Sequence, residues 1–254
     1  MAVAVDSRLH PATRGFEAGE RYERARPEYP APAVDWLVGQ LGLDARPGAR
    51  VLDVGAGTGK LTRPLIERGL RVVAVEPIAG MRTVLERTAQ SADVRAGRAE
   101  ALPLADGEVD AIVVGQAFHW FASAEVLDEF ARVVRHGDRL GLVWNRRDLE
   151  QPLHAAIHQL IAPYRRTTPA HGGDAWRAAF TDAAPFTPAA EQRFVFKQRL
   201  DADGVVDRVL SISFIAALPE HDRGVVEARV RELAGSSPPE LAYSSEVFIY
   251  RRGG

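Results

Sequence analysis

The stretch Val51-Leu52-Asp53-Val54-Gly55-Ala56-Gly57-Thr58-Gly59-Lys60-Leu61 decides the fold of this chain. A short apolar run that stops at a cluster of glycines is typical of a buried parallel strand turning sharply into a helix. Glycines let a ligand approach the backbone closely, and the first N–H groups of the following helix have no partner within it. The stretch therefore predicts a ligand-binding turn at the carboxyl end of a strand.

Apolar runs and helical patterns alternate on both sides of this turn. Before it, the i, i+3, i+4, i+7 spacing of Val34, Leu37, Val38 and Leu41 predicts a helix with one buried face. After it, we expect strands over 71–75, 93–96, 109–114 and 139–145, and helices over 61–69, 81–89 and 123–134. Strands that alternate with helices predict an α/β fold with a doubly wound, mostly parallel sheet.

The pattern changes after Asp148. Helices are expected near 150–163, 203–216 and 219–235, with a strand over 193–200 and a last strand over 246–251 that bring the sheet to seven strands. We therefore predict three parts: residues 1–32 as an N-terminal arm or lid, 33–148 as the cofactor-binding core, and 149–254 as a helical lobe with the last strands. The lobe would act either as a substrate lid or as peripheral packing.

The composition is that of an ordinary globular protein. The 254 residues are 46% apolar and 26% charged, and the net charge of −2 provides no strong field for binding nucleic acid or an anionic membrane. There is no cysteine for a disulfide, a thiolate zinc site or a thiol nucleophile. Because no apolar run approaches the roughly 20 residues of a membrane span, we expect a cytoplasmic protein.

Two phosphate-binding interpretations of the glycine turn are weak. A P-loop needs glycine five residues before the Gly-Lys pair and Ser or Thr after it, but Val54 and Leu61 hold those positions. A dinucleotide fingerprint needs its third glycine at Lys60, and the carboxylate of Asp53 would repel a pyrophosphate. NAD is therefore a less favoured ligand.

S-adenosylmethionine suits these residues better, because it has a cationic amino-acid end, a ribose diol and no phosphate. Glu76 lies 21 residues after Gly55, at the end of the second strand, where an acidic residue accepts hydrogen bonds from both ribose hydroxyls. The combination of Asp53, the spacing G-x-G-x-G and Glu76 resembles the first motif of class I S-adenosylmethionine-dependent methyltransferases.

The resemblance extends to the type-11 group of these enzymes and to its trans-aconitate-methyltransferase-like members. It implies the Rossmann-like fold of class I methyltransferases with a helical lid or substrate lobe. The segments that carry it are Arg26–Pro30, Gly97–Leu104, Gly115–Phe121, Arg132–Asn145 and Tyr243–Arg252. Arg98 departs from the pattern, since relatives often have an Asp there that accepts from the adenine amino group, and Arg cannot accept. We therefore expect backbone groups near Ala99 and Glu100 to bind adenine.

The motif and the resemblance together implicate two sets of residues. The expected cofactor site comprises Tyr22, Asp53, Gly55, Ala56, Gly57, Gly59, Glu76, Pro77, Met81, Ala99, Glu100, Gln116, Ala117 and Phe118. The expected acceptor site comprises Arg26, Tyr29, His119, Trp120, Trp144 and Arg146. No metal is expected, because His154 and His158 have metal-ligand spacing but no third ligand in register.

The resemblance implies methylation of a small molecule, on oxygen and with a carboxylate slightly favoured, with S-adenosylhomocysteine as the other product. An in-line displacement mainly needs positioning, and it needs a base only if the acceptor carries a proton of high pKa. His119 is the candidate catalytic base, or alternatively an aromatic-wall residue. Three alternatives stay open: an enzyme that uses the bound sulfonium electrostatically for rearrangement or elimination, a non-catalytic cofactor-binding subunit, and an NAD-dependent dehydrogenase.

Overall fold

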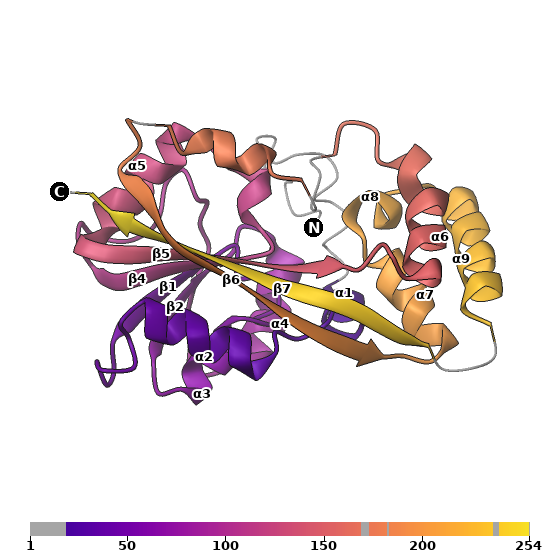
Figure 1. The fold of residues 1–254 in the computed structure, drawn as a ribbon, viewed down its shortest axis with the longest axis horizontal. Helices are drawn as coiled ribbons and strands as arrows, with labels where there is room; N and C mark the ends of the chain where they lie inside the picture. Colours follow the sequence, from indigo (N-terminus) through magenta and orange to yellow (C-terminus); the bar gives the residue numbers. More distant parts are fainter. Residues whose placement is uncertain (1–18, 169–172, 182, 236–238, 254) are drawn as a thin grey trace.

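A computed structural model describes residues 19–168, 173–181, 183–235 and 239–253. Seven strands form one sheet in the order β3-β2-β1-β4-β5-β7-β6 (Figure 1). The pairs among β1 to β5 are parallel, whereas β7 is antiparallel to both β5 and β6. The strands are β1 (Arg50–Val54), β2 (Arg71–Val75), β3 (Asp93–Arg95), β4 (Val109–Gly115), β5 (Val134–Arg147), β6 (Phe186–Arg199) and β7 (Glu240–Arg252). The predicted seven-stranded, mostly parallel sheet is confirmed.

Helices cover both faces of the sheet. Successive residues of a strand point to opposite faces, so the buried strands present apolar side chains on both. Leu52 and Val54 pack on the face covered by α5 (Ala124–Val133) and the short helix η4 (Ala175–Ala179). Val51 packs on the opposite face with the helices before and after β1. That second face is covered by α2 (Ala31–Gln40), α3 (Thr62–Glu67) and α4 (Ala79–Thr88).

The long strands β5, β7 and β6 continue past the core and carry a helical lobe (Figure 1). The lobe has its own apolar cluster, formed by α6 (Pro152–Ile161), η3 (Ala162–Tyr164), α7 (Ala202–Leu210), α8 (Ser213–Ala216) and α9 (Glu220–Ala234). The predicted strands over 139–145, 193–200 and 246–251 were too short. Charged residues such as Glu191 and Arg193 are exposed on β6, so its full length shows only in its pairing with β7.

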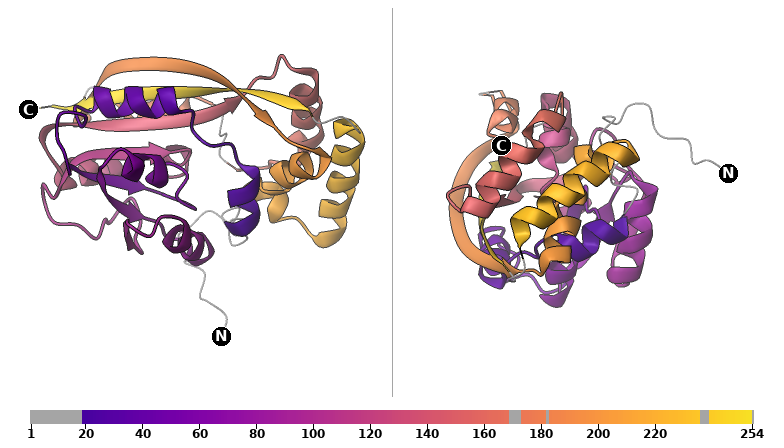
Figure 2. Two further views of the ribbon diagram at one scale, coloured as in Figure 1. Left: turned by 90° about the horizontal axis from the view of Figure 1, so that it is seen from below. Right: turned by 90° about the vertical axis from the view of Figure 1, so that its right-hand side faces the viewer.

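The described part of the predicted N-terminal arm contains a helix of seven residues. Helix α1 (Gly19–Ala25) lies between α4 of the core and α7 of the lobe (Figure 2). A Cβ on Gly19 would lie 2.8 Å from the carbonyl oxygen of Gly80, so the contact with α4 requires glycine. The first 18 residues of the predicted arm lie outside the described part of the chain. Among the described helices, none is long and apolar enough to cross a membrane.

Candidate cofactor and acceptor sites

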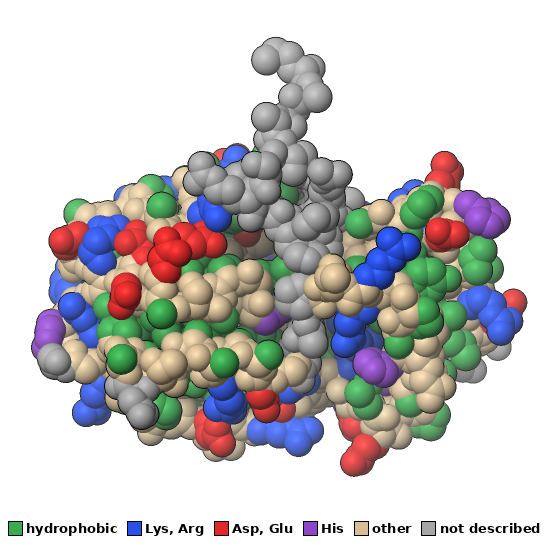
Figure 3. Space-filling view, turned by 90° about the horizontal axis from the view of Figure 1, so that it is seen from above, with side chains coloured by type: hydrophobic (Ala, Val, Ile, Leu, Met, Phe, Trp, Pro, Cys, Tyr) green, Lys and Arg blue, Asp and Glu red, His purple; other side chains and the backbone are tan. Residues whose placement is uncertain are grey.

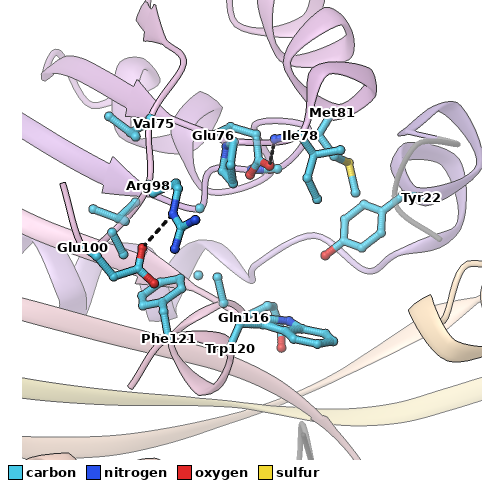
Figure 4. Close-up of a pocket in the computed structure, with 18 residues that line it drawn as sticks. Tyr22, Val75, Glu76, Ile78, Met81, Arg98, Glu100, Gln116, Trp120 and Phe121 are labelled. Atoms are coloured by element: carbon cyan, nitrogen blue, oxygen red, sulfur yellow. Dashed lines mark hydrogen bonds and ion pairs between the residues drawn. The ribbon is translucent and has the colours of Figure 1, made fainter. Parts of the chain in front are cut away.

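A pocket of about 890 Å³, counting the part open to solvent, lies at the carboxyl ends of β1, β2 and β4 (Figure 4). Ligands bind at this edge in doubly wound α/β sheets. Its lining comprises Tyr22, Val54, Gly55, Gly57, Val75, Glu76, Pro77, Ile78, Met81, Gly97, Arg98, Ala99, Glu100, Gly115, Gln116, Ala117, Trp120 and Phe121. Most of the residues that we expected around the cofactor are therefore brought together here.

Two glycines of the turn have different tasks. Gly55 and Gly57 both have positive φ angles, +66° and +60°, which glycine adopts without strain. A Cβ on Gly55 would lie 2.8 Å from the Cβ of Ala117, whereas a Cβ on Gly57 would have nothing within 4 Å. Gly55 thus permits close packing inside the protein, and Gly57 leaves open the space in front of the turn.

Glu76 joins this turn to the end of β2. Its side chain is 5% exposed, and its two oxygens accept hydrogen bonds from the backbone N–H groups of Gly57, at 3.0 Å, and Ile78, at 2.8 Å. Burial raises the pKa of Glu76 to about 7, although both hydrogen bonds oppose the shift. A buried carboxylate with lone pairs to spare, at the wall of a pocket, suits a ligand with hydroxyl donors.

Three predicted cofactor residues of the same stretch, Asp53, Ala56 and Gly59, do not line this pocket. Asp53 accepts a 2.6 Å hydrogen bond from the Thr62 hydroxyl, and burial raises its pKa to about 7. Ala56 packs in a core cluster with Leu85 of α4, and a Cβ on Gly59 would lie 2.8 Å from that leucine. These residues support the turn, and direct contact with a cofactor stays a prediction for them.

Arg98, which we did not expect to bind adenine, does line the pocket. Its Nε lies 3.2 Å from a carboxylate oxygen of Glu100, on the side of the pocket opposite Tyr22 (Figure 4). Ile78 also lines the pocket without having been predicted. The position of Ile78, two residues after Glu76, was a usable indication, because the chain leaves β2 there at the ligand edge.

Two predicted aromatic contacts belong to the core instead. Phe118 and Trp144 are both fully buried. The Phe118 ring meets Phe121 edge-on with centroids 5.8 Å apart, and Trp144 stacks on Trp176 at 4.6 Å. Both side chains point to the face covered by α5 and η4, where they fill the core; the placement of Phe118 on a cofactor and Trp144 on an acceptor is corrected accordingly.

A second pocket of about 1440 Å³, again counting the part open to solvent, adjoins the first and lies between core and lobe. The two pockets share Tyr22, Gln116 and Trp120. Basic and histidine side chains are visible at the boundary between core and lobe (Figure 3). The ionisable residues of the lining, within the described ranges, are Arg26, Arg146, Arg147, Arg165, Arg208, His119, His158 and the shared Tyr22, with no Asp or Glu.

The predicted acceptor residues occupy different environments. Arg26 donates to the hydroxyl and the carbonyl oxygen of Ser211, at 3.1 and 3.0 Å. Arg146 forms ion pairs with Glu246, at 2.7 Å, and Asp174, at 2.9 Å, so its charge is compensated within the protein.

The other predicted acceptor residues are ring side chains. His119 lines the second pocket beside Trp120, and its pKa is lowered to about 4 by burial and by the charge of Arg26. Tyr29 is largely buried and borders a smaller cavity of about 290 Å³ that also touches Arg26. His154 packs against a tyrosine ring, and no metal-binding cluster occurs in the described ranges.

An ion-pair network fastens the N-terminal arm to the glycine turn. We call it the arm clasp: Glu23 accepts from the Thr58 hydroxyl at 2.5 Å and pairs with Arg63 at 2.8 Å, while Glu28 pairs with Lys60 at 2.6 Å. Lys60 is itself only 7% exposed. The clasp positions the intervening arm, and with it Tyr22, where the two pockets meet.

Weakening the arm clasp should weaken cofactor binding. In the double variant Glu23→Gln/Glu28→Gln, Lys60 keeps its buried charge without a carboxylate, and we expect the dissociation constant for S-adenosylhomocysteine to rise about tenfold. Calorimetric titration measures this constant. Glu20→Gln is the matched control, because it removes an exposed pair with Arg87 from the same helix. Equal affinities of double variant, control and wild type would show that the arm has no part in the site.

Comparisons with known proteins agree with this arrangement. Residues 52–142 match a family profile described as methyltransferase domain. An uncharacterized methyltransferase of Mycobacterium tuberculosis is 42% identical over 217 residues, which cover 85% of this chain and 84% of that protein. A solved structure from Anaeromyxobacter dehalogenans that bears the name type II methyltransferase has a TM-score of 0.62 at 24% identity, covering 89% of this chain and 97% of that one.

A geranyl diphosphate methyltransferase in complex with S-adenosylmethionine has the same fold, with a TM-score of 0.52 at 17% identity over 88% of this chain and 85% of that one. The glycine turn, the buried Glu76 beside it and these likenesses lead to one assignment. The chain belongs to the class I S-adenosylmethionine-dependent methyltransferases of the type-11 group, with S-adenosylmethionine as its cofactor.

Proposed function

We propose that the protein transfers the methyl group of S-adenosylmethionine to a carboxylate oxygen of a small acidic molecule. The observation that carries the proposal is the second pocket, which adjoins the cofactor pocket and has five arginines and two histidines, but no Asp or Glu, in its described lining. Arginines bind carboxylates through charge-assisted, often paired hydrogen bonds. A cationic acceptor would be repelled there.

The residues of the two pockets divide the work. When bound, S-adenosylmethionine supplies a methyl group on a sulfonium, so that transfer to a carboxylate gives a methyl ester and S-adenosylhomocysteine without removal of a proton. Glu76 and the backbone at Gly57 hold the ribose end of the cofactor. Arg26, fixed by Ser211, orients the acceptor carboxylate, and Tyr22 and Trp120 exclude water from the junction of the pockets.

His119 acts in this proposal as a neutral wall residue of the acceptor pocket, not as a base. A carboxylate acceptor is ionised at neutral pH, and an imidazole whose pKa is about 4 carries no charge there. We expect His119→Asn to keep kcat within about threefold at saturating acceptor, with no new pH dependence between pH 6 and 8. A loss of about 100-fold or more, the usual contribution of a general base, would restore the catalytic assignment.

Methyl-labelled S-adenosylmethionine and a panel of small carboxylic acids, phosphates, phenols and amines test the function. We expect label in a product that releases methanol in mild alkali, as carboxyl methyl esters do. Base-stable labelled products would refute the carboxylate acceptor and identify another nucleophile. Acceptor conversion without consumption of S-adenosylmethionine would favour the alternative in which the sulfonium serves as an electrostatic catalyst. Glu76→Ala is the inactive control.

A further inference from the structure

Besides Arg26 and Arg146, three arginines line the second pocket, which is the acceptor pocket of the proposed function. Arg147 ends β5, Arg165 follows η3, and Arg208 lies in the last turn of α7. Over the described ranges, none of the three has a carboxylate at ion-pair distance. Arg208 is only 6% exposed, and its Nε has no hydrogen-bond partner. Its guanidinium carbon lies over the Tyr243 ring, 6.0 Å from the ring centroid.

Repulsion among these arginine charges destabilises the unliganded protein. Burial, followed by the charge of Arg208, lowers the pKa of Arg147 to about 10 and that of Arg26 to about 9. Like charges in a poorly solvated site repel each other much more strongly than they do in water. Arg146, in the same pocket, shows the usual solution, with two carboxylates beside it. An anionic ligand would compensate the charges of Arg147, Arg165 and Arg208 in the same way.

We propose that Arg147, Arg165 and Arg208 form a second anion subsite, which binds a carboxylate or phosphate group of the acceptor that is not methylated. The inference rests on the proposed function and narrows it: the acceptor carries at least two anionic groups. His158 lines the same pocket, and its Nδ1 is buried without a partner.

Arg26 is the arginine that contacts a side chain shared by the two pockets: it lies over the ring of Tyr22, 4.8 Å from the ring centroid, and Tyr22 lines both pockets. None of the four arginines lines the first pocket, and Arg26 and Arg208 border one smaller cavity together. An acceptor held at both positions presents one chosen carboxylate to the methyl donor, which is the positioning that a displacement reaction needs.

Three probes of equal chain length test the subsite: valerate, glutarate and 4-phosphonobutyrate, titrated calorimetrically into protein saturated with S-adenosylhomocysteine. We expect glutarate or 4-phosphonobutyrate to bind about tenfold or more tightly than valerate. The ratio of the dissociation constants of glutarate and 4-phosphonobutyrate distinguishes a carboxylate site from a phosphate site. Arg208→Gln should remove this preference and leave valerate unchanged, while Arg208→Lys retains part of it. Arg199→Gln, which removes a charge from an 85% exposed side chain on β6, is the control.

Equal affinity for all three probes in the wild type, or no measurable binding of any, would overturn the inference. So would a lower melting temperature of Arg208→Gln together with loss of every probe, because that result marks a structural role. The methylation assay separates the two proposals. Binding of the dianions without formation of any methyl ester would remove the proposed function and keep the subsite. Equal methylation and equal binding of valerate and glutarate would keep the proposed function and remove the subsite.

Discussion

Glu76→Ala raises the dissociation constant for S-adenosylhomocysteine by about 100-fold or more, because hydrogen bonds to a charged group contribute about 1.5–3 kcal/mol each and the carboxylate is placed to accept two. The substitution also leaves the N–H groups of Gly57 and Ile78 without their acceptors. Calorimetric titration gives the constant directly. Glu86→Ala is the matched control, since it removes an exposed carboxylate from the adjacent helix α4. Unchanged affinity of Glu76→Ala would contradict the assignment of Glu76 to the ribose.

The raised pKa of Glu76 predicts a pH dependence of cofactor affinity. Because its pKa is about 7, Glu76 is protonated in about half of the unliganded molecules near pH 7, and hydroxyl donors favour its ionised form. Binding therefore releases a proton, and the affinity for S-adenosylhomocysteine should rise from pH 6 to pH 8. Asp53 also has a pKa of about 7, so Glu76→Gln, which cannot ionise, identifies the source. A variant with the full wild-type pH dependence would assign it to Asp53.

Those two carboxyl groups should also make the unliganded protein less stable as the pH rises. Their pKa values in the folded protein lie above the ordinary values of 3.8 and 4.5, so their contribution is complete at acidic pH and is lost between about pH 4 and pH 7. The cofactor should reduce this loss, because it stabilises ionised Glu76. Melting temperatures from pH 5 to pH 8, with and without S-adenosylhomocysteine, measure the effect, and parallel curves would refute it.

Gly57→Ala should abolish detectable binding of S-adenosylhomocysteine while the protein stays folded. An alanine at a φ of +60° costs about 1 kcal/mol, which lowers the melting temperature by a few degrees. The new methyl group contacts no protein atom within 4 Å, so it projects into the space that the cofactor needs.

Gly69→Ala is the matched control for Gly57→Ala. Gly69 also has a positive φ, +79°, and open space around its missing Cβ, but it follows α3 away from the pocket. Both variants should be destabilised alike, and only Gly57→Ala should lose the cofactor. Gly55→Ala should be destabilised more than either, because its methyl group would lie 2.8 Å from the Cβ of Ala117. Normal binding by Gly57→Ala would refute the prediction that the cofactor occupies the open space in front of Gly57.

Local chemistry made the cofactor site predictable. The turn and Glu76 lie within 26 residues, so one tight strand-to-helix connection and the end of the neighbouring strand place them together. The sheet, the family and the cofactor that this segment implied are confirmed. The direction of individual side chains was less predictable. Phe118 begins a short 3₁₀ turn that sends its ring into the core, while His119 and Trp120 face the pocket.

The sequence by itself determined the α/β architecture and the cofactor, because strand periodicity, glycine backbone freedom and one spaced carboxylate act over short distances along the chain. Only the tertiary structure decided which arginines line one pocket together. Thirty of the 32 basic residues are arginine; the resemblance named Arg26, but nothing local distinguishes Arg165 and Arg208 from the rest. These arginines line the same pocket as Arg147 because the arm, the far end of β5 and the helical lobe converge on it. Long-range packing, and not local pattern, sets the charge that an acceptor meets there.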